Sequence, residues 1–130
     1  MHSILYKFSE RKRQWEKAVI ILKDNILYEL GGINDKVAKK STFILGYKLE
    51  PNFDVSKNKE LIMSLPRSIS GQAFRLTHLN NMESILFYST ETNVALKWIS
   101  ALQEGACSSH SMPSYQNIGT VESLIKALIK

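Results

Sequence analysis

The basic residues of the chain gather near its beginning. Arg11, Lys12 and Arg13 are consecutive, and Lys7 and Lys17 flank them. Cations at this spacing can hold a phosphate-rich group only if several converge on one pocket, because a single exposed ion pair contributes just ~0–1 kcal/mol. The chain carries 17 Lys and Arg against 12 Asp and Glu, a net charge of +5 that favours acidic partners such as anionic lipid or phosphate. The alternative is a solvated loop whose charge aids solubility.

Other kinds of functional site lack the residues that they need. His2, His78 and His110 are too scattered for a metal site, and Cys107 is the single cysteine. The sequence shows no nucleophile–base spacing and no glycine-rich phosphate loop. Its basic residues are not interleaved with aromatic ones, as binding of single-stranded nucleic acid requires. We therefore expect no catalytic site, no metal, no cofactor and no nucleic-acid partner, and the protein is not expected to be an enzyme.

Length and composition indicate one domain with a short tail. A chain of 130 residues with 44% hydrophobic residues can supply a proper core. The lone cysteine cannot form an internal disulfide, which favours a reducing compartment. No apolar run approaches the roughly 20 residues that span a bilayer, and the apolar stretch near residue 1 is too short for a signal peptide. We expect a cytoplasmic protein.

Short segments rich in β-forming residues must position the basic cluster. Residues 15–23 and 26–30, joined by the turn signal Asp24-Asn25, predict a β-hairpin. Residues 41–50 predict two short strands bent at Gly46, where glycine permits the kink. The remaining predicted strands cover residues 3–8, 73–78 and 83–89. Residues 51–72 form a long connection with a helical turn near residues 57–65.

One long amphipathic helix is predicted over residues 90–105. Val94, Trp98 and Leu102 are four residues apart, which places them on one apolar stripe. A threonine at the start can cap the helix, and Gly105 is expected to end it. The strands must bury their apolar faces against this helix or against one another. Trp98 is therefore expected in the core, whereas Trp15 is expected to be half-buried.

The last 25 residues differ in character from the rest. Residues 106–119 contain Ser, Pro and Asn and predict a linker, and residues 120–130 have the apolar spacing of a short amphipathic helix. About 11 residues cannot hold a helix alone, so we expect this segment to be ordered only if its apolar face docks. Tyr115 begins a Tyr-x-Asn stretch that would resemble an SH2 ligand if phosphorylated.

Several stretches, in order and correctly spaced, resemble a pleckstrin homology (PH) domain over residues 3–105. They are the LYK of residues 5–7, the WEKAVIILKDNILYEL of residues 15–30, the AFRLTH and ILFYSTET of residues 73–78 and 85–92, and the ALKWISALQ of residues 95–103. Trp98 falls at the position of the family's hallmark tryptophan. The STFILGYKLE of residues 41–50 is similar to segments in PH domains of Rho-family exchange factors.

The resemblance implies a seven-stranded antiparallel sandwich, or partly open barrel, capped by a C-terminal helix. It also implies a binding module of a larger signalling or trafficking protein. Many members bind phosphoinositides between their first loops, using a lysine that ends the first strand and cations that enter the second. Lys7 matches the first position, but Glu16 and Ala18 stand where the motif has cations. Glu29 stands where a tyrosine often helps, and its charge would repel phosphate.

Two hypotheses follow from these residues. The first is a monomeric adaptor domain, peripheral at membranes, that binds anionic lipid or phosphoinositide weakly through Lys7, Arg11, Lys12, Arg13 and Lys17. Lysines later in the chain would widen this face; they are Lys23, Lys36, Lys39 and Lys40. The second is a protein-interaction module on the same fold with little lipid binding. The missing cations favour the second hypothesis, and the basic cluster favours the first.

Overall fold

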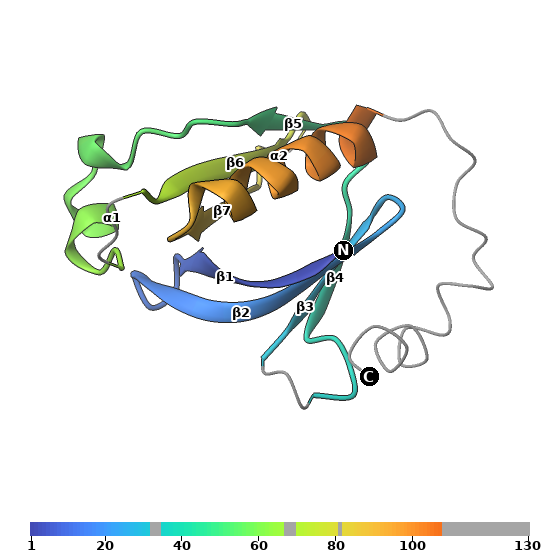
Figure 1. Cartoon of the computed structure of the whole chain (residues 1–130), viewed down its shortest axis with the longest axis horizontal. Coiled ribbons are helices and arrows are strands. Elements are labelled where there is room, and N and C mark those ends of the chain that lie inside the picture. The colour runs from blue at the N-terminus through green and yellow to red at the C-terminus, as the bar shows by residue number, and fades with distance from the viewer. Residues whose placement is uncertain (32–34, 67–69, 81, 108–130) are drawn as a thin grey trace.

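The computed structural model describes residues 1–31, 35–66, 70–80 and 82–107 (Figure 1). Its strands are β1 (His2–Ser9), β2 (Gln14–Lys23), β3 (Ile26–Leu30), β4 (Lys40–Phe43), β5 (Tyr47–Glu50), β6 (Gln72–His78) and β7 (Ser84–Ser89). Its helical elements are the 3-10 turn η1 (Val55–Lys57), the short helix α1 (Lys59–Met63) and the long helix α2 (Thr92–Cys107).

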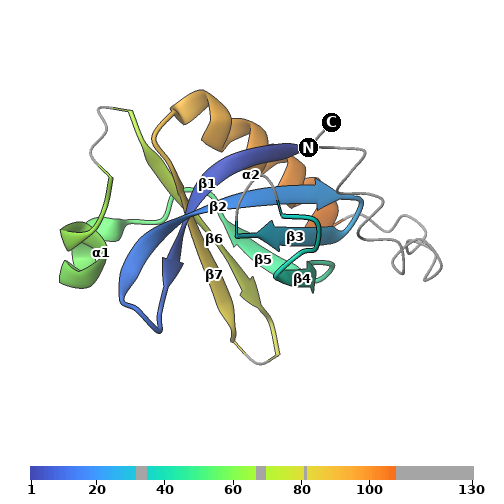
Figure 2. The ribbon, with the colours of Figure 1, turned by 90° about the horizontal axis from the view of Figure 1, so that it is seen from below.

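The strands form one antiparallel sheet in the order β4-β3-β2-β1-β7-β6-β5. The sheet bends where β1 meets β7, because that pairing is short: Tyr6 lies opposite Tyr88 and Lys7 opposite Phe87. The two halves of the sheet therefore cross one another (Figure 2). The edge strands β4 and β5 do not pair in the described part of the chain, so the sheet is not closed. The predicted antiparallel sandwich capped by a C-terminal helix is confirmed.

The predicted strands agree with the observed ones to within a residue or two. The hairpin of β2 and β3 turns at Asp24, whose φ of 55° is the left-handed conformation that aspartate tolerates in tight turns. Gly46 has a φ of 86°, so the predicted bend between β4 and β5 uses a conformation that favours glycine. The predicted helical turn in the long connection is α1, which Asn58 caps by accepting from the Glu60 backbone N–H.

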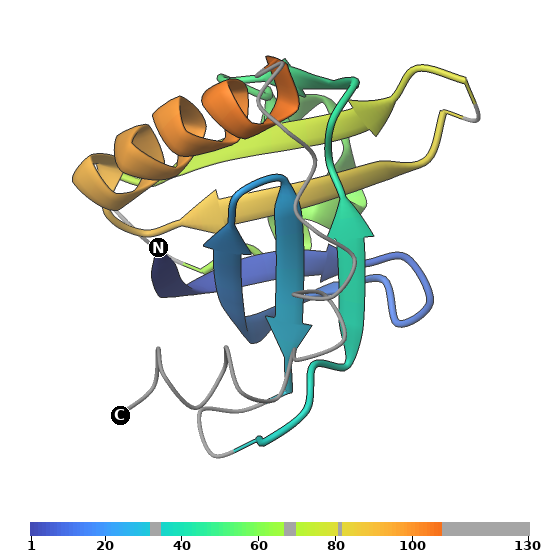
Figure 3. The ribbon, with the colours of Figure 1, turned by 90° about the vertical axis from the view of Figure 1, so that its right-hand side faces the viewer.

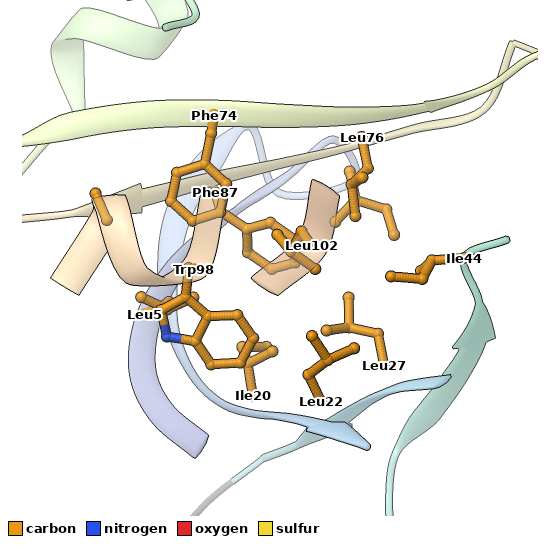
Figure 4. Close-up of a cluster of buried hydrophobic side chains, with 12 residues drawn as sticks. Leu5, Ile20, Leu22, Leu27, Ile44, Phe74, Leu76, Phe87, Trp98 and Leu102 are labelled. Atoms are coloured by element: carbon orange, nitrogen blue, oxygen red, sulfur yellow. The ribbon is translucent and has the colours of Figure 1, made fainter. Parts of the chain in front are cut away.

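The main core lies between the two halves of the sheet and α2 (Figure 4). One half supplies Leu5, Ile20, Leu22 and Leu27, and the other supplies Phe74, Leu76, Ile85 and Phe87. Helix α2 supplies Ala95, Trp98 and Leu102, all with 0% exposure. The apolar stripe predicted from the spacing of Trp98 and Leu102 is therefore the buried face of the helix.

The prediction that Gly105 ends the helix is wrong, because α2 continues to Cys107. Gly105 instead permits a close approach: a Cβ at this position would lie 3.1 Å from Ile44 Cδ1 and 3.2 Å from the Asp24 carbonyl oxygen. The buried Asn25 side chain donates a hydrogen bond to the Gly105 carbonyl, and the Gly46 N–H donates to the Ala106 carbonyl at 2.9 Å. These donors satisfy carbonyls that a helix end otherwise leaves unpaired.

Trp15 is buried, with 7% exposure, rather than half-buried as predicted. Its indole Nε1 donates to the Leu61 carbonyl at 2.9 Å, and its ring contacts Phe8 and Tyr88. Helix α1 thus covers the start of β2. The partner lies 46 residues away along the chain, so no local pattern could reveal the cover.

The domain limits of 3 and 105 stay a prediction. Strand β1 begins at His2, and Ala106 is buried at the end of α2 with 4% exposure. The predicted linker and C-terminal amphipathic segment lie outside the described residues from residue 108 onward, and so does Tyr115.

We predict that Trp98→Ala lowers the free energy of unfolding by about 3–5 kcal/mol, as truncations of large core side chains do. Chemical denaturation monitored by circular dichroism measures this loss. Leu96→Ala is the matched control, because Leu96 lies on the same helix but is 52% exposed. Wild-type stability in Trp98→Ala would contradict the assignment of Trp98 as the central contact of the core.

Candidate functional site

The turns of the β1–β2 and β6–β7 hairpins lie at one end of the molecule, which we call the mouth (Figures 2 and 3). Side chains alternate between the two faces of a strand, so Lys7 shares the inner face with the buried Leu5. The register places Glu16 opposite Lys7 and Ala18 opposite Leu5 on β2. Ile20 lies opposite Glu29 on β3, which places Glu29 on the same inner face. The mouth therefore carries charges of both signs.

Lys7 and Glu29 form an ion pair inside the mouth. The Lys7 Nζ donates to Glu29 Oε1 at 2.6 Å, and the side chains are 26% and 8% exposed. The second carboxylate oxygen, Glu29 Oε2, is buried and has no hydrogen-bond partner in the described part of the chain. Removing Lys7 would leave a nearly buried carboxylate uncompensated, which is costly in a low-dielectric interior. Glu29, expected only to repel phosphate, is thus the partner of the lysine expected to bind it.

The turn between β1 and β2 is also partly paired. The Arg13 guanidinium contacts both carboxylate oxygens of Glu60 at 2.8 Å, and this hydrogen-bonded pair raises the pKa of Arg13 above its ordinary value. Lys12 Nζ lies 3.4 Å from Glu16 Oε2, with both side chains well exposed. Arg11 is exposed and has no recorded ion-pair partner within the described residues. Of the cations in this turn, Arg11 is therefore the most available to an external anion.

Lys17 lies on the opposite face of the sheet from Lys7. It stands across from Tyr6 in the register, and its Nζ is 5.9 Å from the Tyr6 ring centroid. The expected site residues are thus distributed over the inner face, the turn and the outer face. Ala18 packs against the main core, so its position is not an open place for a cation.

A hollow of about 800 Å³ opens beside the mouth. Its charged and titratable lining comes from Glu10, Lys40, Tyr47, His78 and Glu83. The Tyr47 and His78 rings meet edge-on with centroids 5.0 Å apart, and burial together with the Glu83 charge raises the pKa of Tyr47. The segments that line the hollow are far apart in sequence, so sequence patterns gave no signal for it.

The hollow does not have the charge of a polyphosphate pocket. Two carboxylates, Glu10 and Glu83, line it together with a single lysine, so it lacks the converging lysine and arginine side chains of such a pocket. Among the described residues, no group of His, Cys, Asp and Glu is arranged to hold a metal ion. No helix in the described ranges is long and apolar enough to cross a membrane.

Comparison of the backbone with solved structures gives a clear match. The C-terminal PH domain of pleckstrin, solved with an inositol pentakisphosphate, aligns over 82% of this chain and 93% of its own with a TM-score of 0.63 and 13% identity. The PH domain of Slm1, solved with inositol 4-phosphate, aligns over 82% of this chain and 94% of its own with a TM-score of 0.61 and 15% identity. The chain has the pleckstrin homology fold.

A curated protein supports this assignment by sequence. The human "FYVE, RhoGEF and PH domain-containing protein 5" is 30% identical over 98 residues, which cover 73% of this chain. The PH-type chain spans only 6% of the length of that protein, so the match concerns one small part of it. The relative is named as a Rho-type exchange factor, in agreement with the similarity noted at residues 41–50. No family model matches the chain.

We predict that Lys7 and Glu29 are energetically coupled. A double-mutant cycle with Lys7→Met and Glu29→Gln should give a coupling energy of roughly 1–3 kcal/mol in denaturant unfolding, because each single change leaves its partner poorly solvated. The matched control is the cycle of Lys12→Met with Glu16→Gln. That pair is exposed, and its coupling should be about 0.5 kcal/mol or less. Equal couplings in the two cycles would show that the mouth pair is as solvated as the surface pair.

Proposed function

We propose that this PH-type chain is a non-catalytic adaptor domain of a larger intracellular signalling or trafficking protein. It binds anionic headgroups at the cytoplasmic face of membranes, phosphoinositides among them, weakly and as a monomer. The contact runs through the basic β1–β2 turn. Arg11 and Lys12 contribute most to binding of the headgroup. Arg13 and Lys17 add positive charge, and Lys7 contributes least.

The pairing of cations with carboxylates is the reason for proposing that binding is weak. Lys7, Lys12 and Arg13 each lie within 4 Å of a carboxylate oxygen of Glu29, Glu16 or Glu60. A phosphate that approaches must compete with these internal partners and meets their negative charge. What remains is a loop with a small excess of positive charge, and a basic residue near an anionic membrane contributes ~1 kcal/mol. Such a surface gives weak binding that depends on total charge more than on the isomer.

The neighbours in structure support the class of ligand. The solved PH domains of pleckstrin and Slm1 hold inositol phosphates, and their fold is that of this chain. The shared fold makes a phosphorylated headgroup the natural first ligand to test. Because the sequence identity is low, the affinity and the residues of the site must be argued from this chain's own side chains.

Two observations favour the second hypothesis, a protein-interaction module. The nearly buried Lys7–Glu29 pair, and a hollow lined by two carboxylates and one lysine, leave the mouth without the converging free cations that tight phosphate binding uses. A partner protein with mixed charge would find complementary groups there. This alternative predicts no binding to anionic vesicles even at low salt.

We predict that Arg11→Glu with Lys12→Glu reduces binding to vesicles containing phosphoinositide by roughly tenfold or more, since two attractions of ~1 kcal/mol each become repulsions. Sedimentation of the protein with vesicles over a salt series measures this. The matched control is Lys48→Glu with Lys97→Glu, which makes the same change in net charge at exposed positions outside the turn. Wild-type binding should fall steeply with salt, because screening acts over about 8–10 Å.

The outcomes separate the hypotheses. Equal losses in the two double variants would show that net charge, and not the β1–β2 turn, drives binding. Tight binding that distinguishes isomers of equal charge would place the headgroup in a different and better organised site. No binding to any anionic vesicle at low salt would favour the protein-interaction module.

A further inference from the structure

The outer face of β2 and β3 carries a second apolar cluster, separate from the main core. Alternation along the paired strands places Val19 and Ile21 of β2 beside Ile26, Tyr28 and Leu30 of β3 on this face. These side chains are only 7%, 0%, 5%, 1% and 1% exposed. An uncovered sheet face does not reach such values, so a further segment must lie over it.

The described elements do not supply that cover. Helix α2 packs on the opposite, inner face with the main core, and α1 packs at Trp15. In the described ranges, the only partly buried apolar residue recorded against this cluster is Ala38, from the loop before β4. These exposed fractions belong to one copy of the chain, so neither a second copy nor a partner protein accounts for them.

The width of the cover can be read from the edges of the cluster. Ile4 of β1, next to Val19, is 59% exposed, and Phe43 of β4, next to Ile26, is 38% exposed. The five cluster side chains of β2 and β3 are therefore nearly fully buried, whereas the apolar side chains beside them on β1 and β4 are more exposed. Strands lie ~4.8 Å apart, and a helix with its side chains is ~10 Å across. One helix covers about two strands, which is the width observed.

The chain leaves α2 beside this face. The helix ends at the β2–β3 turn, where Asn25 bonds to the Gly105 carbonyl and Gly105 approaches the Asp24 carbonyl. Ile26 follows that turn directly. Residues 108–119 can extend over roughly 40 Å, far more than the few strands that must be crossed. A segment that starts at residue 120 can thus reach any part of the cluster.

The last residues have the composition that such a cover needs. Val121, Leu124, Ile125, Leu128 and Ile129 recur at helical spacing, while Lys126 and Lys130 lie on the other side. An 11-residue helix is about 16 Å long, close to the ~17 Å length of a five-residue strand such as β3. The segment is too short to be helical by itself, and the cluster offers the apolar surface that it lacks.

We propose that residues 120–130 form an amphipathic helix that docks its apolar stripe on the outer face of β2 and β3 in the same chain. The C-terminal segment is then part of the domain, and α2 is followed by a second, external helix. The outer face of this half of the sheet is occupied, which leaves the mouth and its basic turn as the surface for external ligands. This proposal does not depend on the identity of those ligands.

Methyl-labelled NMR of the full chain tests the contact without any substitution. We expect nuclear Overhauser effects from the methyl groups of Ile21 and Leu30 to those of Leu124 and Leu128, and protection of the cluster methyls from a soluble gadolinium chelate. A sample mixed from differently labelled chains tells contacts within a chain from contacts between chains. Effects between chains, or exposed cluster methyls, or protected methyls without contacts to the tail would each overturn the proposal.

A matched pair of variants tests the energetic role. Leu124→Asp with Leu128→Asp places two charges on the apolar stripe, and Ser123→Asp with Ala127→Asp places two at the same spacing on the opposite side of the predicted helix. The stripe variant should lower the melting temperature by roughly 5–10 °C and expose the Ile21 and Leu30 methyls to the chelate. The control should stay within about 2 °C of the wild type. Equal effects of the two variants would overturn the proposal.

Discussion

Burial of α2 between the two halves of an unclosed sheet is the constraint on which the fold depends. Strands β4 and β5 leave the sheet open, and the helix closes the gap with Trp98 and Leu102. A fully buried tryptophan removes 150–250 Å² from water, which stabilises the fold by about 4–6 kcal/mol at 25 cal/mol per Å². The indole Nε1 has no partner in the described part of the chain, at a cost of about 1–3 kcal/mol. The stabilisation from burying the Trp98 ring is larger than the cost of its unpaired N–H, so burial of Trp98 stabilises the position of the helix.

Contacts at the C-terminal end of α2 add to this central burial. Without a side chain, Gly105 lets the helix approach Ile44 and the β2–β3 turn, and Asn25 bonds to its carbonyl. Ile44, with 0% exposure, lies just beyond β4 and joins the main core at the same place. The open edge of the sheet is thereby fixed to the helix by hydrogen bonds as well as by packing. Strand β2, which follows the basic turn, is then held near both of its ends, by α2 near Asn25 and by α1 near Trp15.

The sequence was a good guide wherever local pattern decides structure. Spacing identified the stripe of Trp98 and Leu102, and residue type identified the hairpin turn at Asp24 and the bend at Gly46. It failed where a distant contact overrides the local rule. Gly105 has the character of a helix end, yet the approach of Ile44 gives it a packing role within the helix. Glu60 as the partner of Arg13, and Glu29 as the partner of Lys7, depend on pairs 47 and 22 residues apart. No local pattern contains them, so the number of cations was predictable and their availability was not.

The two faces of the β1–β4 half of the sheet show two ways in which side chains are buried. On the inner face, Lys7 and Glu29 stand where the sandwich opens, and their mutual attraction replaces the solvent that burial removes. On the outer face, the apolar side chains of β2 and β3 have no charge to satisfy and need only a cover. A segment with an apolar stripe meets that need at little electrostatic cost, whereas an anionic headgroup could not. In the turn between β1 and β2, by contrast, cations such as Arg11 remain exposed to water and keep their charge available.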